Sequence, residues 1–119
     1  MADRNLIRAT SNLPQVLVSA QLANAEASIY ACPSNSSVTI ATATLCNTSG
    51  ASKTVYLSVV KATGTAGVAN RVAIIDLAPN ESCIVDELVG LFLSPADFIS
   101  GYASAAASVA LVLTGAVSS

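Results

Sequence analysis

The stretch that decides the fold is ASVALVLTGAV, residues Ala107–Val117. Successive side chains of an extended chain point to opposite faces, so Val109, Leu111 and Leu113 share one face and the residues between them share the other. The apolar run around this stretch is about 15 residues long, whereas a membrane-spanning helix needs roughly 20. The alternation and the β-branched residues predict a closing β-strand, and we expect no membrane span.

Similar short runs, rich in Val, Ile, Thr and Tyr, recur from Gln15 onward, and clusters of Gly, Pro, Asn and Ser separate them. This pattern is typical of an antiparallel sandwich. We predict an all-β protein, an antiparallel β-sandwich of about eight strands whose order is either jelly-roll or immunoglobulin-like, because both orders share these local signals. The predicted strands are Gln15–Leu22, Ser28–Cys32, Ser37–Cys46, Lys53–Ala62, Arg71–Leu77, Ser82–Glu87, Asp97–Ala103 and Ala107–Val117.

One predicted strand carries an irregularity. In Ser37–Cys46, Val38 and Ile40 fall on one face of the strand but Leu45 falls on the other. A single extra residue in an antiparallel strand reverses the alternation in this way. We therefore expect a β-bulge between Ala41 and Thr44.

The length of the chain, 119 residues, suits one domain that buries its own core. Residues 1–14 are mostly polar with isolated apolar side chains such as Leu6 and Ile7, and Pro14 would end a short helix here. They are predicted to form an extended N-terminal arm, and residues 15–119 a single β-sandwich domain. No continuous apolar signal sequence follows Met1, so we expect synthesis in a cytoplasm.

The asparagines and cysteines have simple structural interpretations. Three N-x-S/T sequences begin at Asn35, Asn47 and Asn80, and without a secretion signal we interpret them as turn residues and not as glycosylation sites. The cysteines are Cys32, Cys46 and Cys83. They are odd in number, lack C-x-x-C spacing and lie in apolar runs, so they are predicted to be buried free thiols.

Charged residues are scarce in this chain. Hydrophobic residues make up 53% and charged residues only 10%, against about 25% charged in a typical globular domain. Isolated proteins seldom expose large apolar patches, so we infer that neighbouring molecules cover much of the exterior and expect a homo-oligomer. The net charge of −2 and the pI of about 4.7 argue against a nucleic-acid partner.

The residues that most often carry chemistry are missing. The chain has no histidine, the commonest general base and metal ligand, and no phosphate-binding glycine-rich motif. The only candidate acids and bases are Asp76, Asp86, Glu87 and Asp97, and their spacing fits no specific site. We expect no enzyme activity, no catalytic residues, no cofactor and no metal.

Three tyrosines keep a different alternative open. Tyr30, Tyr56 and Tyr102 each fall within a predicted strand, and an exposed ring could stack on a sugar. A carbohydrate-binding module is therefore a further alternative, although a tyrosine in a sandwich is more often a core side chain with its hydroxyl at the rim.

Several stretches taken together resemble small β-sandwich virion proteins of long-tailed bacteriophages. In that family a tyrosine-x-x-proline, an apolar strand, an asparagine-threonine turn and a second apolar strand follow one another, and a leucine-x-proline-glycine-aspartate stretch and a closing strand come later. The matching stretches are Ala27–Pro33, Val38–Ala41, Leu45–Gly50, Thr54–Leu57, Leu77–Ser82, Leu93–Ile99 and Val109–Gly115. Ala96 stands where glycine is common, which argues against a positive φ at that turn.

The resemblance implies a non-enzymatic structural protein of the virion, made in the host cytoplasm: a capsid decoration or minor capsid protein or, alternatively, a minor tail or tail-tip protein. The composition favours decoration by a cyclic oligomer, expected to be a trimer, that binds the major capsid protein. In the alternative the partners are tail proteins, and exposed loops such as Val68–Arg71 contact the host. The residues expected to contact partners are Arg4, Leu6, Ile7 and Arg8.

Overall fold

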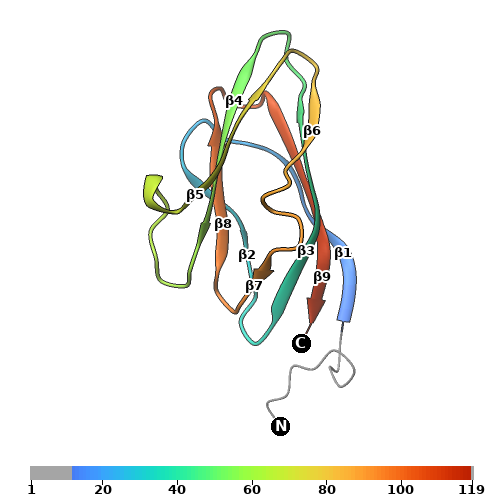
Figure 1. Ribbon diagram of the computed structural model, residues 1–119, viewed down its shortest axis with the longest axis vertical. Coiled ribbons are helices and arrows are strands. Elements are labelled where there is room, and N and C mark those ends of the chain that lie inside the picture. The colour runs from blue at the N-terminus through green and yellow to red at the C-terminus, as the bar shows by residue number, and fades with distance from the viewer. Residues whose placement is uncertain (1–11, 119) are drawn as a thin grey trace.

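The computed structural model describes residues 12–118, which form two β-sheets packed face to face (Figure 1). The strands are β1 (Asn12–Gln21), β2 (Ala27–Ala31), β3 (Ser37–Asn47), β4 (Lys53–Val60), β5 (Arg71–Leu77), β6 (Ser82–Ile84), β7 (Phe92–Leu93), β8 (Phe98–Ala103) and β9 (Val109–Ser118), with a short 3₁₀ turn, η1 (Val68–Asn70), before β5. Over this range there is no helix long and apolar enough to cross a bilayer.

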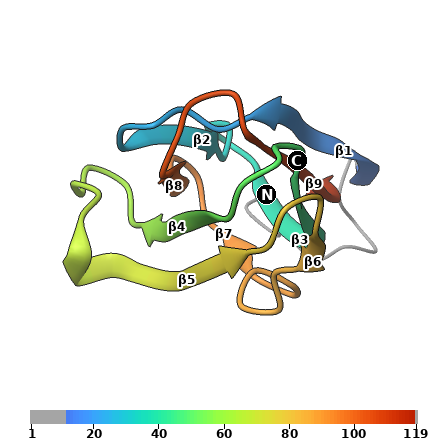
Figure 2. The same ribbon diagram turned by 90° about the horizontal axis from the view of Figure 1, so that it is seen from above.

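The first sheet has the order β1-β9-β3-β6, with β7 also paired to β3, and the second has the order β2-β8-β4-β5. Each of these pairings is antiparallel. Figure 2 shows the two sheets as separate layers seen from above. The prediction of an all-β antiparallel sandwich is confirmed.

The strand order resolves the choice between the two predicted topologies. β6 and β7 both pair with β3, at Thr44–Cys46 and at Val38–Thr39, so they are two pieces of one interrupted edge strand. Counted as one, they leave eight strands in which the first pairs with the last and consecutive strands alternate between the sheets, except where β5 follows β4 within the second sheet. This is the order of a jelly roll and not of an immunoglobulin domain.

The predicted strand Ser82–Glu87 is wrong at its C-terminal end, because β6 stops at Ile84. After Ile84 the chain forms consecutive tight turns. In them the Leu88 N–H donates to the Val85 carbonyl at 3.1 Å, and the Leu91 N–H donates to the Leu88 carbonyl at 3.2 Å. Val85 and Leu88 are both fully buried. Both side chains therefore hold the loop against the core. In a β-strand, two residues three positions apart would point to opposite faces, so alternation could not predict that both are buried.

Leucine, isoleucine and valine fill the core between the sheets. Val109, Leu111 and Leu113 of β9 are all fully buried, in one cluster with Ile40 and Leu45 of the neighbouring β3 and with Leu57 of the opposite sheet. Burying one such side chain contributes about 1.5–3 kcal/mol. The alternation predicted for the closing strand is confirmed.

The predicted β-bulge is also present. Pairing between β3 and β9 shifts register between Ile40 and Thr42, which makes Ala41 the extra residue. The shift lets Val38 and Ile40 on one side, and Leu45 on the other, all point into the core. β9 follows β3 closely here, since a Cβ at Gly115 would lie 2.1 Å from the Thr39 carbonyl oxygen.

β1 begins at Asn12, before the predicted start at Gln15. Leu13 pairs with Val117 and Pro14 with Ala116 of β9. Proline is tolerated in this strand because β1 is the edge of its sheet, where an amide hydrogen bond need not be made.

The asparagine turns agree with the structural interpretation. Asn35 and Asn80 have positive φ angles of 62° and 59°, which asparagine tolerates in turns. Asn47 is fully buried, and its amide donates to the carbonyl oxygens of Ala51 at 2.8 Å and Ala78 at 3.0 Å. Its side-chain oxygen accepts from the Ser49 N–H at 3.0 Å. One side chain thereby joins the β3–β4 turn to the β5–β6 turn.

The expectation for Ala96 is wrong: its φ is +70°. Hydrogen bonds stabilise this turn. The Ala96 N–H donates to the Cys32 carbonyl of another loop at 3.1 Å, and within the turn the Asp97 N–H donates to the Ser94 carbonyl at 3.0 Å. The Asp97 carboxylate also accepts from the Ser94 N–H at 3.1 Å. These bonds outweigh the cost of about 1–2 kcal/mol for a Cβ in the left-handed region.

Replacing Asn47 by alanine should lower the free energy of unfolding by about 2–4 kcal/mol, because it removes the hydrogen bonds by which this buried side chain joins the β3–β4 turn to the β5–β6 turn. Urea denaturation would measure the change. The matched substitution Asn24→Ala, at an exposed loop position, should change it by less than about 0.5 kcal/mol. Equal effects at the two positions would contradict the role assigned to Asn47.

The substitution Ala96→Gly should raise the free energy of unfolding by about 0.5–1 kcal/mol, because it removes the left-handed strain. Ala78 is an exposed turn alanine that does not have a positive φ. Ala78→Gly should therefore lower stability by about the same amount. Thermal denaturation of both variants tests the assignment, which fails if Ala96→Gly also melts below the parent protein.

Candidate functional site

The structure does not bring the four candidate acids together into one site. Asp97 is buried and accepts from the backbone N–H groups of Ser94 and Ala62, at 3.1 and 2.9 Å. Asp76 accepts from the Thr54 hydroxyl at 2.8 Å on the second sheet, and Asp86 and Glu87 are exposed in the β6–β7 loop. No group of three His, Cys, Asp or Glu side chains suited to a metal ion occurs in residues 12–118.

The contact residues predicted in the arm, Arg4, Leu6, Ile7 and Arg8, lie outside the described residues. Other surfaces, formed by the described residues, have features suited to a ligand or a partner. Three stand out: the outer face of the first sheet, a tyrosine-arginine cluster on the second sheet, and a hollow between β1 and β2.

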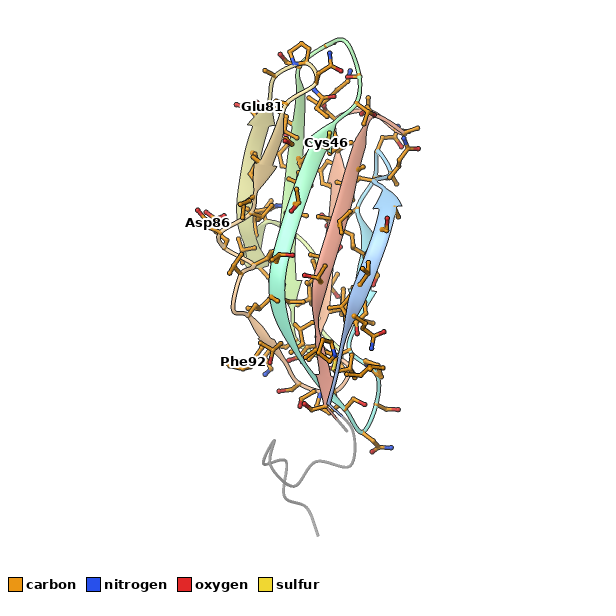
Figure 3. The ribbon with its side chains drawn as sticks, turned by 90° about the vertical axis from the view of Figure 1, so that its right-hand side faces the viewer. Cys46, Glu81, Asp86 and Phe92 are labelled. Carbon is orange, nitrogen blue, oxygen red and sulfur yellow. The ribbon has the colours of Figure 1, made fainter. Side chains whose placement is uncertain are left out.

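Among residues 13–118, the outer face of the first sheet carries no charged side chain on its strands. The strand registers place residues in rows across this sheet, so that Val16, Thr114 and Thr42 are neighbours. We define the uncharged face by its outward residues Pro14, Val16, Ser19 and Gln21 of β1, Ala110, Val112, Thr114 and Ala116 of β9, Thr39, Thr42, Thr44 and Cys46 of β3, Ser82 and Ile84 of β6, and Phe92 of β7. Figure 3 views the molecule toward this sheet, with Cys46 and Phe92 labelled.

The chemistry of the uncharged face suits close packing against protein. Its centre is small and β-branched, and the hydroxyls of Thr42 and Thr114 satisfy each other across the strands. Its margins are apolar and open: Val16 is 58% exposed, Ile84 65% and Phe92 77%. Covering such a face desolvates no charge, which is the costly step in burying polar surface.

The tyrosines of the second sheet pack on each other. The rings of Tyr56 and Tyr102 stack with centroids 4.6 Å apart and planes 18° apart. The Arg71 guanidinium lies 5.5 Å from each centroid and pairs with Glu26 at 3.2 Å. The Ser100 hydroxyl donates to the other carboxylate oxygen of Glu26 at 2.8 Å.

Most groups of this cluster that could contact a ligand already contact one another. One face of each tyrosine ring is covered by the other ring, and the arginine already has its carboxylate partner. Tyr30 is not part of the cluster; it is half-buried against the core, and burial, with a smaller effect of Cys32, raises the pKa of its hydroxyl. Stacking therefore leaves at most one face of Tyr56 and of Tyr102 open to a ligand.

The hollow between β1 and β2 is apolar. It has a volume of about 180 Å³ and is lined by side chains such as Val18, Leu22 and Ile29, with Gly101 at its floor. No ionisable residue lines it. It offers shape but no group for acid-base or metal chemistry.

All three cysteines are free thiols, as predicted, but only Cys32 is fully buried. Burial, and after it the nearby Asp97 carboxylate, raises the pKa of the Cys32 thiol. Burial also raises the pKa of Cys83, and Glu81, Asp86 and Glu87 add to the effect. Raised pKa values keep both thiols protonated and weakly nucleophilic at neutral pH.

Replacing each of two neighbouring serines on the second sheet by alanine should change the free energy of unfolding in opposite directions. Ser58 is fully buried, and its hydroxyl is the one buried side-chain polar atom between residues 12 and 118 that makes no hydrogen bond. Its cross-strand neighbour Ser100 bonds both Glu26 and the Ala27 carbonyl. Ser58→Ala should raise the free energy of unfolding by about 1 kcal/mol, and Ser100→Ala should lower it by about 1.5–3 kcal/mol.

Chemical denaturation of both serine variants would measure these changes. A loss of stability in Ser58→Ala comparable to that in Ser100→Ala would show that the Ser58 hydroxyl has a partner after all.

Comparison with models of protein families, with curated proteins and with solved structures found no match in any of the three.

Proposed function

We propose that this chain is a non-enzymatic structural protein of a bacteriophage virion that binds and stabilises the assembled capsid as a decoration or minor capsid protein. The observation that carries the proposal is the uncharged face, in which the outward side chains of β1, β9, β3, β6 and β7 include no ionised group. A face of this kind gains free energy when protein covers it and pays no cost for desolvating charge.

Two further points support the proposal. The sequence resembles small β-sandwich virion proteins along most of its length, and the jelly roll is an architecture used by viral capsid proteins, although lectins and cupins share it. Cupin chemistry depends on metal-binding histidines, which this chain lacks. Fold alone does not assign function, so the proposal rests mainly on the uncharged face.

The proposed action is mechanical. Copies of the chain associate into a trimer, and the trimer binds the major capsid protein of neighbouring capsomers. A protein that binds the assembled shell and not its free subunits stabilises the shell by mass action, by about 2.7 kcal/mol per site at a free concentration one hundred times Kd. No chemical step and no cofactor enters this mechanism.

The second candidate is a minor tail or tail-tip protein that contacts the host. Val68, at the tip of the loop between β4 and β5, is 86% exposed, which favours a contact made by this loop. The loop lies beside the second sheet, away from the uncharged face (Figure 1). Variants of the two surfaces therefore separate the two functions.

A lysine placed on the uncharged face should weaken capsid binding. Val16→Lys and Thr114→Lys each put a cation where the partner must cover it, and we expect each to weaken binding to purified empty capsids of the encoding phage about tenfold or more. Co-sedimentation with increasing protein concentrations would measure the affinity, and light scattering of the free protein would report its oligomeric state.

The matched control is Ile74→Lys, which changes a similarly exposed apolar residue (64%) on the opposite sheet. It should bind capsids as the parent protein does. If all three variants bind equally, or if Ile74→Lys alone fails, the uncharged face is not the attachment surface. Immunogold labelling of intact particles on the tail and not on the shell would favour the second candidate.

A further inference from the structure

The free edge of the first sheet carries an apolar strip bordered by acids. Ile84 (65% exposed), Val89 (45%) and Phe92 (77%) follow one another from β6 through the loop to β7. The acids Glu81, Asp86 and Glu87 lie along the same course, and Figure 3 shows Glu81, Asp86 and Phe92 one below another on this edge. We call these six residues the β6–β7 strip.

The acids of the strip have no cationic partner among residues 12–118. The ion pair that the structure shows in that range joins Arg71 to Glu26 on the other sheet. Glu81 accepts a backbone hydrogen bond from Ala78 at 2.7 Å, whereas Asp86 and Glu87 project from the loop. Exposed carboxylates beside apolar surface, such as the consecutive Asp86 and Glu87, would be stabilised by a nearby cation.

The chain itself holds a segment of complementary chemistry. Residues 12–118 contain six acids and three bases, a charge of −3, whereas the whole chain has −2, so residues 1–11 contribute +1. Within those residues, Arg4 and Arg8 flank the apolar pair Leu6 and Ile7. The arginines are complementary in charge to the acids of the strip, and the apolar pair suits its exposed apolar side chains.

The segment also has the length to reach the strip of its own molecule. Pro14, Ala116, Thr39 and Phe92 lie in one row across four adjacent strands, which places Phe92 about 14 Å from Pro14, two residues after the start of β1, at a strand spacing of about 4.8 Å. The β3 partners of Phe92 and Ile84 are five residues apart, or about 16 Å along the edge. Eleven extended residues span about 36 Å, which covers both legs.

We propose that residues 1–11 bind along the β6–β7 strip of the same molecule. Leu6 and Ile7 cover Val89 and Phe92, and Arg4 and Arg8 pair with Asp86 and Glu87. The inference concerns the isolated protein and does not depend on the proposed attachment to capsids. It gives an intramolecular partner to Phe92, the aromatic side chain that is most exposed among the described residues. Ile84 and Phe92 also belong to the uncharged face, so residues 1–11 would have to leave these two side chains before a partner could cover them.

Trypsin provides a direct test on the full-length protein. Arg4 and Arg8 are two of only five lysines and arginines in the chain, so cleavage after each can be followed by intact-mass spectrometry under native conditions. Docking should protect both bonds. The variants Phe92→Ser and Asp86→Asn/Glu87→Gln should each speed cleavage at Arg4 and Arg8 about tenfold, a change equivalent to about 1.4 kcal/mol.

Matched controls lie on the opposite sheet. Ile74→Ser removes a similarly exposed apolar side chain and Asp76→Asn an exposed acid, and neither should change the cleavage rate. Protection should not depend on protein concentration. Equal rates in strip variants and controls would overturn the proposal, and protection that falls on dilution would overturn the same-molecule assignment in favour of exchange between copies.

Nuclear magnetic resonance gives a second readout that cannot be confused with loss of folding. In full-length Arg4→Gln/Arg8→Gln protein, backbone amide shifts should change at Asp86, Val89 and Phe92 and stay constant at Ile74. Shifts unchanged along the strip would overturn the proposal, whatever the result of the capsid-binding experiment.

Discussion

The structure depends on the pairing of β9 with both β1 and β3. β9 lies between the first and third strands of the chain and pairs with each along nearly its whole length. Its inner residues Val109, Leu111 and Leu113 are fully buried against the second sheet. The last strand thus joins the first strand to the rest of the sandwich.

That pairing also determines the surface. Once the leucines of β9 point inward, strict alternation sends Ala110, Val112 and Thr114 outward, and the registers with β1 and β3 set equally uncharged residues beside them. The bulge at Ala41 keeps this arrangement through β3, because it lets residues on both sides of it pack inward. The uncharged face is therefore a consequence of the same registers that build the core.

Alternation within a strand was readable from the sequence, and so the sandwich, the inward face of β9 and the bulge in β3 were predicted. Strand order was not readable, because jelly-roll and immunoglobulin-like orders share the same local signals. The uncharged face and the Tyr56–Tyr102 stack were missed for that reason: each needs strands distant in sequence to become neighbours. The break after Ile84 and the φ of Ala96 were missed because tertiary hydrogen bonds decide them.

The two sheets differ in what they present to solvent, and this asymmetry bears on function. On the second sheet, several outward polar groups bond one another, through the Glu26–Arg71 pair and the Asp76–Thr54 bond. Breaking such pairs to bind a partner would cost desolvation and lost hydrogen bonds. In the part of the chain that the structure describes, the first sheet has threonine hydroxyls and apolar side chains on its outer face but no ion pair to break. Association through the first sheet is therefore favoured over association through the second, whichever protein supplies the partner surface.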